Sequence, residues 1–253
     1  KASFFAISAG FMYIREPERK DKERMTNLQI QQTDDGSHTL YWPEKNEHYH
    51  SVHGSVQEAR KVYVETALVP AMDACMSAGT DTVQVFEMGL GTALNACLTL
   101  QEAEKRHMKV AYTAIEALPL PEDVWRRLNY PQALGIESRV FEAFHRQAFD
   151  AREHALSPYF SLTKIQAEMQ AAVLPGKRFH AVYYDAFAPS VQPELWEPGI
   201  FVKLRQACTT PCFLGTYCAQ GRFRRNLRSA GFAVESLPGP KGKREITRGI
   251  VLS

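Results

Sequence analysis

The fold is decided by the stretch Thr82-Val-Gln-Val-Phe-Glu-Met-Gly-Leu-Gly-Thr-Ala-Leu-Asn-Ala-Cys-Leu98. Its apolar run Val83–Phe86 is typical of a buried strand, and Gly89 and Gly91 follow it closely. From Thr92 to about His107, Ala and Leu recur at helical spacing. The order of strand, glycine turn and helix predicts the opening unit of a nucleotide-binding α/β sheet, in which glycine lets the backbone approach a ligand.

The residues of this turn distinguish between cofactors. A dinucleotide site requires the pattern G-x-G-x-x-G, but Leu94 occupies the third glycine position. Glu87 precedes Gly89 by two residues, where it would repel a phosphate and suits a cationic ligand. Glu-x-Gly-x-Gly is the arrangement of class I methyltransferases, in which the acid lies near the amino-acid end of S-adenosylmethionine. An ordinary glycine turn is the alternative.

Composition indicates one α/β domain with an appendage. The chain has 253 residues, of which 45% are hydrophobic, and a formal net charge of +2. Residues 222–253 hold eight Lys and Arg against two Glu, a local net charge of +6. Such an excess can attract phosphate backbones, although a solvated helix face would look the same.

No metal site, disulfide or membrane span is expected. The five cysteines form no C-x-x-C pair, which favours reduced thiols and a cytoplasmic protein. Three histidines within Asn46–Gly54 lack the further ligands of a metal set. No apolar run is long enough to cross a bilayer. Met25 is the expected natural start, with Lys1–Arg24 an extension of uncertain status.

The segment 25–80 is expected to form an N-terminal hairpin and helix packed on the core. Leu28–Gln32 and His38–Trp42 flank the turn signal Asp34-Asp35-Gly36-Ser37. Ser55 is predicted to cap the following helix, with Glu58 as its capping-box partner. That helix is expected to end at Ser77-Ala78-Gly79-Thr80.

The segment 81–253 is expected to form the main domain. Lys109–Ile115 is a second strand ending at Glu116, an acid placed to accept hydrogen bonds from ribose hydroxyls. Leu118–Leu128 is predicted as a helix. In Ser138–Ala171, only a short strand near Phe149 is expected.

The second half of this domain predicts a further strand at Phe179–Tyr184 that ends in Asp185, at the edge where α/β sheets bind ligands. The remaining predicted elements are the strand Phe213–Cys218, the basic helix Arg222–Ala230, and the strands Ala233–Leu237 and Ile246–Leu252. A closing antiparallel hairpin is typical of class I methyltransferases. The predicted fold is therefore α/β, Rossmann-like and mostly parallel, with a C-terminal antiparallel hairpin and a small N-terminal hairpin-helix extension.

Several motifs together resemble one family. In chain order they are Asn46-Glu-His-Tyr-His-Ser51 with Gly54, Phe86-Glu-Met-Gly-Leu-Gly-Thr-Ala-Leu-Asn95, Tyr184-Asp-Ala-Phe-Ala-Pro189 with Pro193-Glu-Leu-Trp196, Thr216-Tyr-Cys-Ala-Gln-Gly221 with Arg224-Arg225, and Lys243-Arg-Glu245. From about Met25 to Ser253 the chain resembles the MnmC-type tRNA methyltransferases, which methylate 5-aminomethyl-2-thiouridine at the tRNA wobble position. Many members carry a fused flavin-dependent oxidoreductase, and this chain resembles the stand-alone form.

The resemblance implies roles for residues of this chain. S-adenosyl-L-methionine would be held by Glu87, Gly89, Gly91, Asn95 and Glu116. Asp185 would face both the methyl donor and the acceptor amine, and would be the catalytic residue. An acid before the Asp-Ala-Phe strand is expected to contact adenine, but Glu168 is the sole candidate and its register is unclear. The adenine contact is therefore unassigned.

Substrate contacts follow from the chemistry of an anticodon base. Methyl transfer needs a free lone pair on the amine, which Asp185 could orient by a hydrogen bond rather than by true base catalysis. Tyr49, His50 and Ser51 would form a lid, and Phe187 would stack on the base or belong to the core. The tRNA anticodon stem-loop is the expected partner, with its phosphates on Arg224, Arg225, Lys243 and Arg244.

Three alternatives stay open from the sequence. One is a class I methyltransferase acting on another amine or nucleic acid. A second is an NAD-dependent oxidoreductase, which Leu94 and the closing hairpin disfavour. A third is a non-catalytic RNA-binding module with the same fold.

Overall fold

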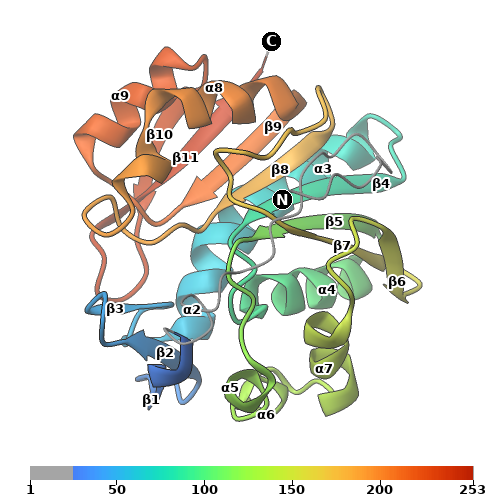
Figure 1. Ribbon diagram of the computed structural model, residues 1–253. Helices are drawn as coiled ribbons and strands as arrows, with labels where there is room; N and C mark the ends of the chain where they lie inside the picture. Colours follow the sequence, from blue (N-terminus) through green and yellow to red (C-terminus); the bar gives the residue numbers. More distant parts are fainter. Residues whose placement is uncertain (1–24, 253) are drawn as a thin grey trace, which may run out of the picture.

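The structure is a computed structural model that describes residues 25–252. The expected extension Lys1–Arg24 lies outside the described residues. A central sheet of eight strands is covered by helices on both faces, and a separate sheet of three strands lies at one end (Figure 1). Among residues 25–252, no helix is both long enough and apolar enough to cross a bilayer.

The central sheet has the strand order β10-β11-β9-β8-β4-β5-β7-β6. The strands are β4 (Thr82–Met88), β5 (Lys109–Glu116), β6 (Glu153–Ser157), β7 (Phe160–Gln166), β8 (Phe179–Tyr184), β9 (Cys208–Thr216), β10 (Ala233–Pro238) and β11 (Glu245–Val251). The five strands from β9 to β7 are parallel, whereas β6, β10 and β11 pair antiparallel. The predicted mostly parallel sheet with a closing hairpin is confirmed.

The chain reverses its direction of travel across the sheet at β4. From β4 it proceeds to β5 and β7 on one side, and then crosses to β8 and β9 on the other. In open α/β sheets, ligands bind outside the carboxyl ends of the strands at such a switch point. The topology therefore places a binding site at the ends of β4, β5 and β8.

Side chains of β4 enter two separate hydrophobic cores. Val83 and Val85 belong to one core, and Phe86 and Met88 to the other, on the opposite face of the sheet. Because both faces are covered, the strand reads as a nearly continuous apolar run. The first face carries α2 (Ser55–Ala59), η2 (Arg60–Leu68), α3 (Val69–Ser77), α4 (Leu94–Arg106) and α7 (Ser138–Arg146), and the second carries η3 (Pro193–Trp196), α8 (Pro198–Ala207) and α9 (Gly221–Ser229).

The N-terminal sheet confirms the predicted hairpin. β1 (Gln29–Gln32) pairs antiparallel with β2 (His38–Trp42), and the two-residue β3 (Glu47–His48) extends the sheet. The short helices η1 (Met25–Asn27), α5 (Glu122–Trp125) and α6 (Tyr130–Leu134) complete the described elements. The main-chain nitrogen of His38 donates to Asn129 Oδ1 at 2.8 Å, which ties the hairpin to the main domain.

The predicted capping box of the long N-terminal helix is wrong. The helix begins at Ser55 with Gly54 as the capping residue, and no side chain caps it. Gly54 has a φ of 137°, which permits the sharp entry into the helix. The Glu58 carboxylate turns away from the helix terminus and accepts a hydrogen bond from the Ser51 nitrogen at 2.7 Å. The helical run does end at Ser77, as predicted.

Two further predictions are corrected by the structure. No strand lies at Phe149, and the missed strands are β6 and β7. The predicted helix Leu118–Leu128 is reduced to the four residues of α5, because Pro119 and Pro121 disfavour helical backbone just before them. The helix after the glycine turn begins at Leu94 instead of Thr92, since Gly91 and Ala93 adopt left-handed backbone conformations.

Candidate active site

A cavity of about 620 Å³ lies at the carboxyl ends of β4, β5 and β8, where the topology places a ligand site. It is lined by the glycine turn, the segment after β5, the segment after β7, the Asp-Ala-Phe segment after β8, and the N-terminal lid. Its lining includes Trp42, Tyr49, His50, Ser51, Glu58, Tyr63, Gly89, Gly91, Glu116, Glu168, Asp185, Phe187, Tyr217 and Lys243. The site is therefore assembled from segments distributed over the whole described chain.

The two glycines of the turn are required by close approaches. Gly89 has a φ of 87°, and a Cβ there would lie 2.9 Å from the Asp185 carbonyl oxygen. Gly91 has a φ of 48°, and a Cβ there would lie 3.3 Å from the Tyr49 ring. Side chains at either position would be strained and would crowd the cavity wall. The turn thus presents bare backbone to the cavity.

Glu116 is fixed at the end of β5 by main-chain donors. Its Oε2 accepts from the Gly91 nitrogen at 2.9 Å, and its Oε1 accepts from the Leu118 nitrogen at 2.8 Å. Burial raises the pKa of this carboxyl group, and these hydrogen bonds oppose that rise. The carboxylate lines the cavity beside the glycine turn, in the position expected of an acid that accepts from ribose hydroxyls.

Asp185 is held by two side chains from different elements. Its Oδ1 accepts from the Tyr63 hydroxyl at 2.6 Å, and its Oδ2 accepts from Asn95 Nδ2 at 2.8 Å. Burial raises the pKa of Asp185 to about 7, and the two hydrogen bonds limit the rise. A carboxyl group with this pKa can both hold and release a proton near neutral pH. The sequence favours orientation of the amine over base catalysis, whereas a pKa of about 7 also allows Asp185 to accept a proton.

Tyr63 is a site residue that sequence reasoning missed. It belongs to η2, a π-helical segment within the long N-terminal helical run, where Thr66 Oγ1 donates to the Lys61 carbonyl at 2.8 Å. π-Helical segments redirect side chains and are frequent at functional sites. Gly215 of β9 makes room for η2, because a Cβ there would collide with the Val62 carbonyl. In the sequence, Gly215 inside a predicted strand is the signal that another backbone approaches there closely.

Glu87 and Asn95 lie beneath the cavity rather than in its lining. Glu87 is fully buried, and its Oε1 accepts from Asn95 Nδ2 at 2.9 Å. Burial raises the pKa of Glu87 well above its ordinary value, because burial disfavours the charged form of the carboxyl group. The same Asn95 nitrogen donates to Asp185, so Glu87 acts on the cavity through Asn95. Neither residue is among those that line the cavity.

The N-terminal lid covers the cavity. The Tyr49 ring packs edge-to-face on Phe187, with ring centroids 5.1 Å apart. His50 Nε2 lies 2.8 Å from Thr92 Oγ1, which joins the lid to the glycine turn. Burial lowers the pKa of His50 to about 4, so the ring is neutral at pH 7. Tyr49, Ser51 and Phe187, which the sequence assigns to substrate contacts, all line the cavity.

The three lid histidines do not converge on one point. His48 contacts Gln31, His50 contacts Thr92 and His53 contacts Asp34. Among residues 25–252 no cluster of three potential metal ligands occurs. All five cysteines are buried and free of disulfides.

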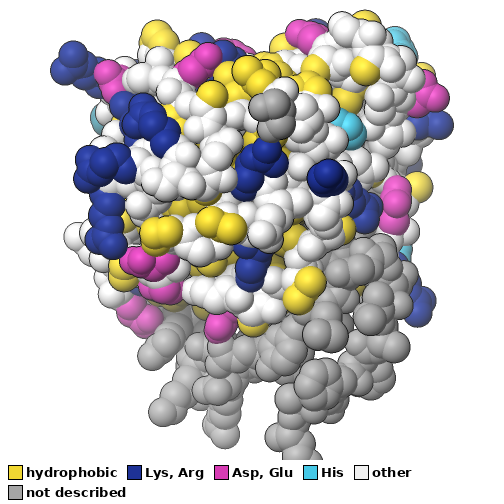
Figure 2. All heavy atoms as spheres, turned by 90° about the horizontal axis from the view of Figure 1, so that it is seen from above, with side chains coloured by type: hydrophobic (Ala, Val, Ile, Leu, Met, Phe, Trp, Pro, Cys, Tyr) yellow, Lys and Arg dark blue, Asp and Glu magenta, His cyan; other side chains and the backbone are white. Residues whose placement is uncertain are grey.

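The predicted basic residues divide into three groups. Arg224 is held by the closing hairpin, where its guanidinium donates to Thr247 Oγ1 at 2.9 Å and Glu245 Oε2 at 3.1 Å. Arg225 is exposed on α9, and the exposed Arg244 lines a second hollow of about 530 Å³ beside the cavity. Figure 2 shows Lys and Arg side chains at the left edge of the face seen from above, with others over its middle and at its right edge.

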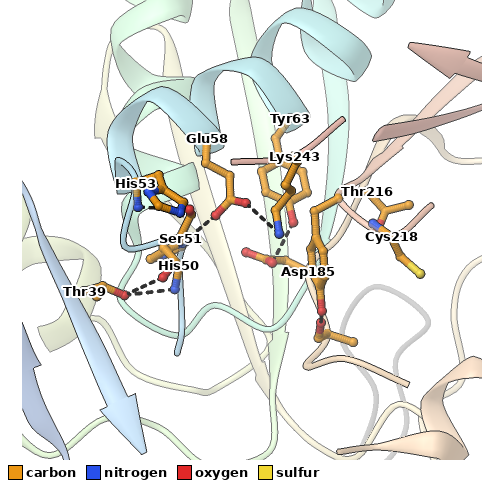
Figure 3. Close-up of polar contacts among 12 residues, drawn as sticks. Thr39, His50, Ser51, His53, Glu58, Tyr63, Asp185, Thr216, Cys218 and Lys243 are labelled. Atoms are coloured by element: carbon orange, nitrogen blue, oxygen red, sulfur yellow. Dashed lines mark hydrogen bonds and ion pairs between the residues drawn. The ribbon is translucent and has the colours of Figure 1, made fainter. Parts of the chain in front are cut away.

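Lys243 points into the main cavity rather than outward. Its Nζ lies 3.3 Å from Glu58 Oε1, and Figure 3 shows both side chains beside Asp185 and Tyr63. Glu58 is a second cavity residue that the sequence assigned to another role, that of a helix cap. Lys243 also lines the second hollow, which therefore adjoins the cavity.

Comparison with known proteins identifies the class of this site. A family of S-adenosyl-L-methionine-dependent methyltransferases matches residues 139–251. The bifunctional tRNA 5-methylaminomethyl-2-thiouridine biosynthesis protein MnmC of Pseudomonas aeruginosa strain UCBPP-PA14 is 28% identical over 214 residues. The MnmC of Magnetococcus marinus is 27% identical over 225 residues. In sequence, this chain is similar to part of the MnmC proteins, and the matched family is one of S-adenosyl-L-methionine-dependent methyltransferases. The aligned regions cover 79% and 84% of the chain but 32% of each relative, so the chain spans about a third of those proteins.

Solved structures agree with this fold. The crystal structure of MnmC2 from Aquifex aeolicus superposes with a TM-score of 0.68 at 21% identity, covering 88% of this chain and 70% of that one. Spermidine synthase from Thermotoga maritima gives a TM-score of 0.50 at 11% identity, with 88% and 72% covered. These likenesses concern the fold, which is that of class I methyltransferases. The matches favour methyl transfer over the nicotinamide alternative.

S-adenosyl-L-methionine is the cofactor of the matched methyltransferase family, and the residues at the cavity fit it. Because Gly89 and Gly91 carry no side chains, the turn leaves room for close approach to the backbone. Glu116 offers carboxylate oxygens where ribose hydroxyls require acceptors. Glu168 follows β7 and also lines the cavity, beside Ala167 and Met169.

Proposed function

We propose that this chain methylates the primary amine of 5-aminomethyl-2-thiouridine at the wobble position of tRNA, in the cytoplasm. The proposal is supported by the relatives' names and, within the site, by one observation. Asp185 lines the cavity at the switch point, with both oxygens fixed by Tyr63 and Asn95 and a pKa of about 7. An ammonium must lose a proton before its nitrogen can accept a methyl group, and a carboxylate with a raised pKa is a better proton acceptor than an ordinary one.

The reaction needs an unprotonated amine. An alkylammonium has a pKa near that of Lys, about 10.4, so the substrate arrives charged at neutral pH. Ionised Asp185 would accept a hydrogen bond from the ammonium and then its proton, leaving a nitrogen lone pair. When bound, S-adenosyl-L-methionine supplies an electrophilic methyl group on a sulfonium. The hydrogen bonds from Tyr63 and Asn95 keep the Asp185 carboxylate aimed throughout.

The cofactor is proposed to be held by five residues, namely Glu87, Gly89, Gly91, Asn95 and Glu116. Of these, Glu87 would act indirectly, because it lies beneath the lining and holds Asn95. Tyr49, Ser51 and Phe187 are proposed to contact the base, since all three line the cavity. An anticodon base can be splayed out of its loop without breaking a duplex.

The anticodon loop is proposed to approach over the second hollow. Arg244 lines this hollow and the exposed Arg225 lies on the neighbouring helix α9, so both are available to phosphates. Such contacts supply affinity and position with little sequence preference. Arg224 is assigned a structural role instead, because its guanidinium already donates to the closing hairpin.

Labelled methyl transfer tests the proposed function. The substrate is tRNA that carries 5-aminomethyl-2-thiouridine, and the control is tRNA that lacks the aminomethyl group. Wild-type protein should label the first only, and Asp185→Asn should abolish labelling while cofactor binding changes by no more than a few fold. Labelling of both tRNAs, or of neither, would contradict the proposed substrate. Retained turnover in Asp185→Asn would exclude its role as proton acceptor.

A further inference from the structure

A second carboxylate faces the cavity from the lid side of Asp185. Glu58 on α2 is only 7% exposed, and its Oε2 accepts from the Ser51 nitrogen at 2.7 Å. Its Oε1 is buried and makes no hydrogen bond among the described residues. The nearest cation is Lys243 Nζ, an ion-pair partner at 3.3 Å. Among the described residues, the Lys243 ammonium is therefore the partner of this acceptor atom at the cavity.

The Lys243 ammonium lies in a position suited to any alkylammonium. Besides Glu58 Oε1, it faces the Tyr217 ring, whose centroid is 4.8 Å from Nζ. A carboxylate on one side and an aromatic face on the other are the elements of a cation site. Figure 3 shows this ammonium close to Asp185, and its charge lowers the pKa of that carboxyl group. The cation site thus adjoins the proposed reacting carboxylate.

We propose that Lys243 occupies the place that the substrate's own ammonium takes on arrival, and that Glu58 is the carboxylate that receives it. This inference rests on the proposed function, because it requires an amine-bearing substrate. Glu58 is a binding and specificity residue in this account, and Asp185 remains the proton acceptor. The sequence-based assignment of Lys243 to tRNA phosphates is replaced.

Charge repulsion explains why the substrate's ammonium would displace Lys243 from Glu58. Two ammonium groups in one site repel each other, so Lys243 must withdraw when the substrate binds. Without substrate, its presence avoids an unpaired buried carboxylate, which would destabilise the fold. Lys243 lies on the loop between β10 and β11, next to exposed Gly242, so the side chain can move toward solvent. The ammonium is also only partly buried, with the side chain 31% exposed.

The test compares two tRNAs that differ only in the aminomethyl group of one base. Dissociation constants are measured with S-adenosylhomocysteine present, for tRNA with 5-aminomethyl-2-thiouridine and for tRNA with 2-thiouridine. Phosphate contacts are common to both, so the ratio isolates the amine. Wild type should prefer the amine by about tenfold or more, as expected for a hydrogen bond between charged groups. Glu58→Gln keeps an acceptor for Ser51 and should lose most of this preference.

Matched variants make the result specific. Glu65→Gln removes an exposed carboxylate of η2 that pairs with Lys61, and it should leave the ratio unchanged. Lys243→Met should raise the ratio, because the internal competitor is gone. Lys241→Met should not raise the ratio, because Lys241 lies on the same loop but pairs with Asp34 at the surface.

The other possible results contradict either the inference about Glu58 and Lys243 or the proposed function. An equal ratio in wild type and Glu58→Gln overturns the inference, as does a Lys243→Met variant that weakens both tRNAs equally. If wild type methylates the amine-bearing tRNA yet binds both tRNAs alike, the cation site is wrong and the proposed function stands. If wild type neither binds nor methylates that tRNA, both fail.

Discussion

The Tyr63 hydroxyl lies 2.6 Å from Asp185 Oδ1, although the two residues are separated by 122 positions in the sequence. Tyr63 comes from the π-helical segment η2, and Asp185 comes from the carboxyl end of β8. The hydrogen bond favours the ionised carboxyl group and opposes the effect of burial on its pKa. The proton affinity of Asp185 is therefore set jointly by the sheet and by the N-terminal helical run.

Replacing Tyr63 by Phe should raise the pKa of Asp185 above its value of about 7, because the hydrogen bond that favours ionisation is removed. A shift of about one pH unit corresponds to the energy of such a bond, and methyl transfer at pH 7 should fall about fivefold. Activity should recover at higher pH. Tyr183→Phe, which removes a buried hydroxyl bonded to Thr99, is the control and should leave the pH profile in place.

The wild-type rate of methyl transfer should increase with pH, because Asp185 must be ionised to accept the substrate's proton. Because the pKa of Asp185 is about 7, kcat/KM should rise from pH 6 to pH 8 and then level off. Methyl-transfer rates across this range test the prediction. A profile that is flat from pH 6 to pH 8 would show that Asp185 does not take up the substrate proton.

The free energy of unfolding should decrease as pH rises, which is opposite to the expected change in the rate. The folded-state pKa of Asp185 is raised from 3.8 to about 7, so the folded protein binds more protons than the unfolded chain between these values. Its contribution to the free energy of unfolding is present in full below pH 4 and is lost as pH rises through about 7. Buried Glu87 acts in the same direction. Urea unfolding at pH 5 and pH 8 should show a smaller pH difference for Asp185→Asn than for wild type.

The parallel sheet and its ligand edge could be predicted from the sequence because they depend on local patterns. The Glu-x-Gly-x-Gly turn, the strand before Asp185 and the closing hairpin all carry their signals in contiguous residues. β7 was missed because Lys164 interrupts its apolar pattern. In the structure Lys164 is buried, and its Nζ donates to the carbonyls of Phe144 and His145, both at 2.9 Å. Partners from another element make a buried lysine tolerable, and the sequence does not reveal them.

The same limit applies to the candidate site. Asp185, Glu116 and the glycines could be located because each ends a strand. Tyr63 and Glu58 lie within a long helical run, where spacing alone does not indicate which side chain faces a cavity. The sequence does not show that Arg224 and Arg225 have different roles. Adjacent positions on a helix face different neighbours, and the structure is needed to show which neighbours each side chain has.

Gly215 should be essential for the geometry of the site. A Cβ at this position would collide with the Val62 carbonyl and push η2 away from β9. Gly215→Ala should lower the free energy of unfolding by about 1–3 kcal/mol, the usual cost of overpacking, and should reduce methyl transfer by displacing Tyr63. Gly199→Ala in α8 is the control, since a Cβ there meets nothing within 4 Å and should be neutral or stabilising. Denaturant unfolding and turnover should be compared for both variants.

Arg224 and Arg225 should separate into a structural and a tRNA-binding residue. Arg224→Met removes the donors to Thr247, Glu245 and Ser236, and it should lower the melting temperature. Arg225→Met combined with Arg244→Met should leave stability unchanged and should weaken tRNA binding. Each lost phosphate contact should reduce the slope of log affinity against log salt concentration by about 0.7 to 0.9. A salt slope equal to that of wild type in the double variant would mean that both side chains are only solvated surface, and that the tRNA phosphates lie elsewhere.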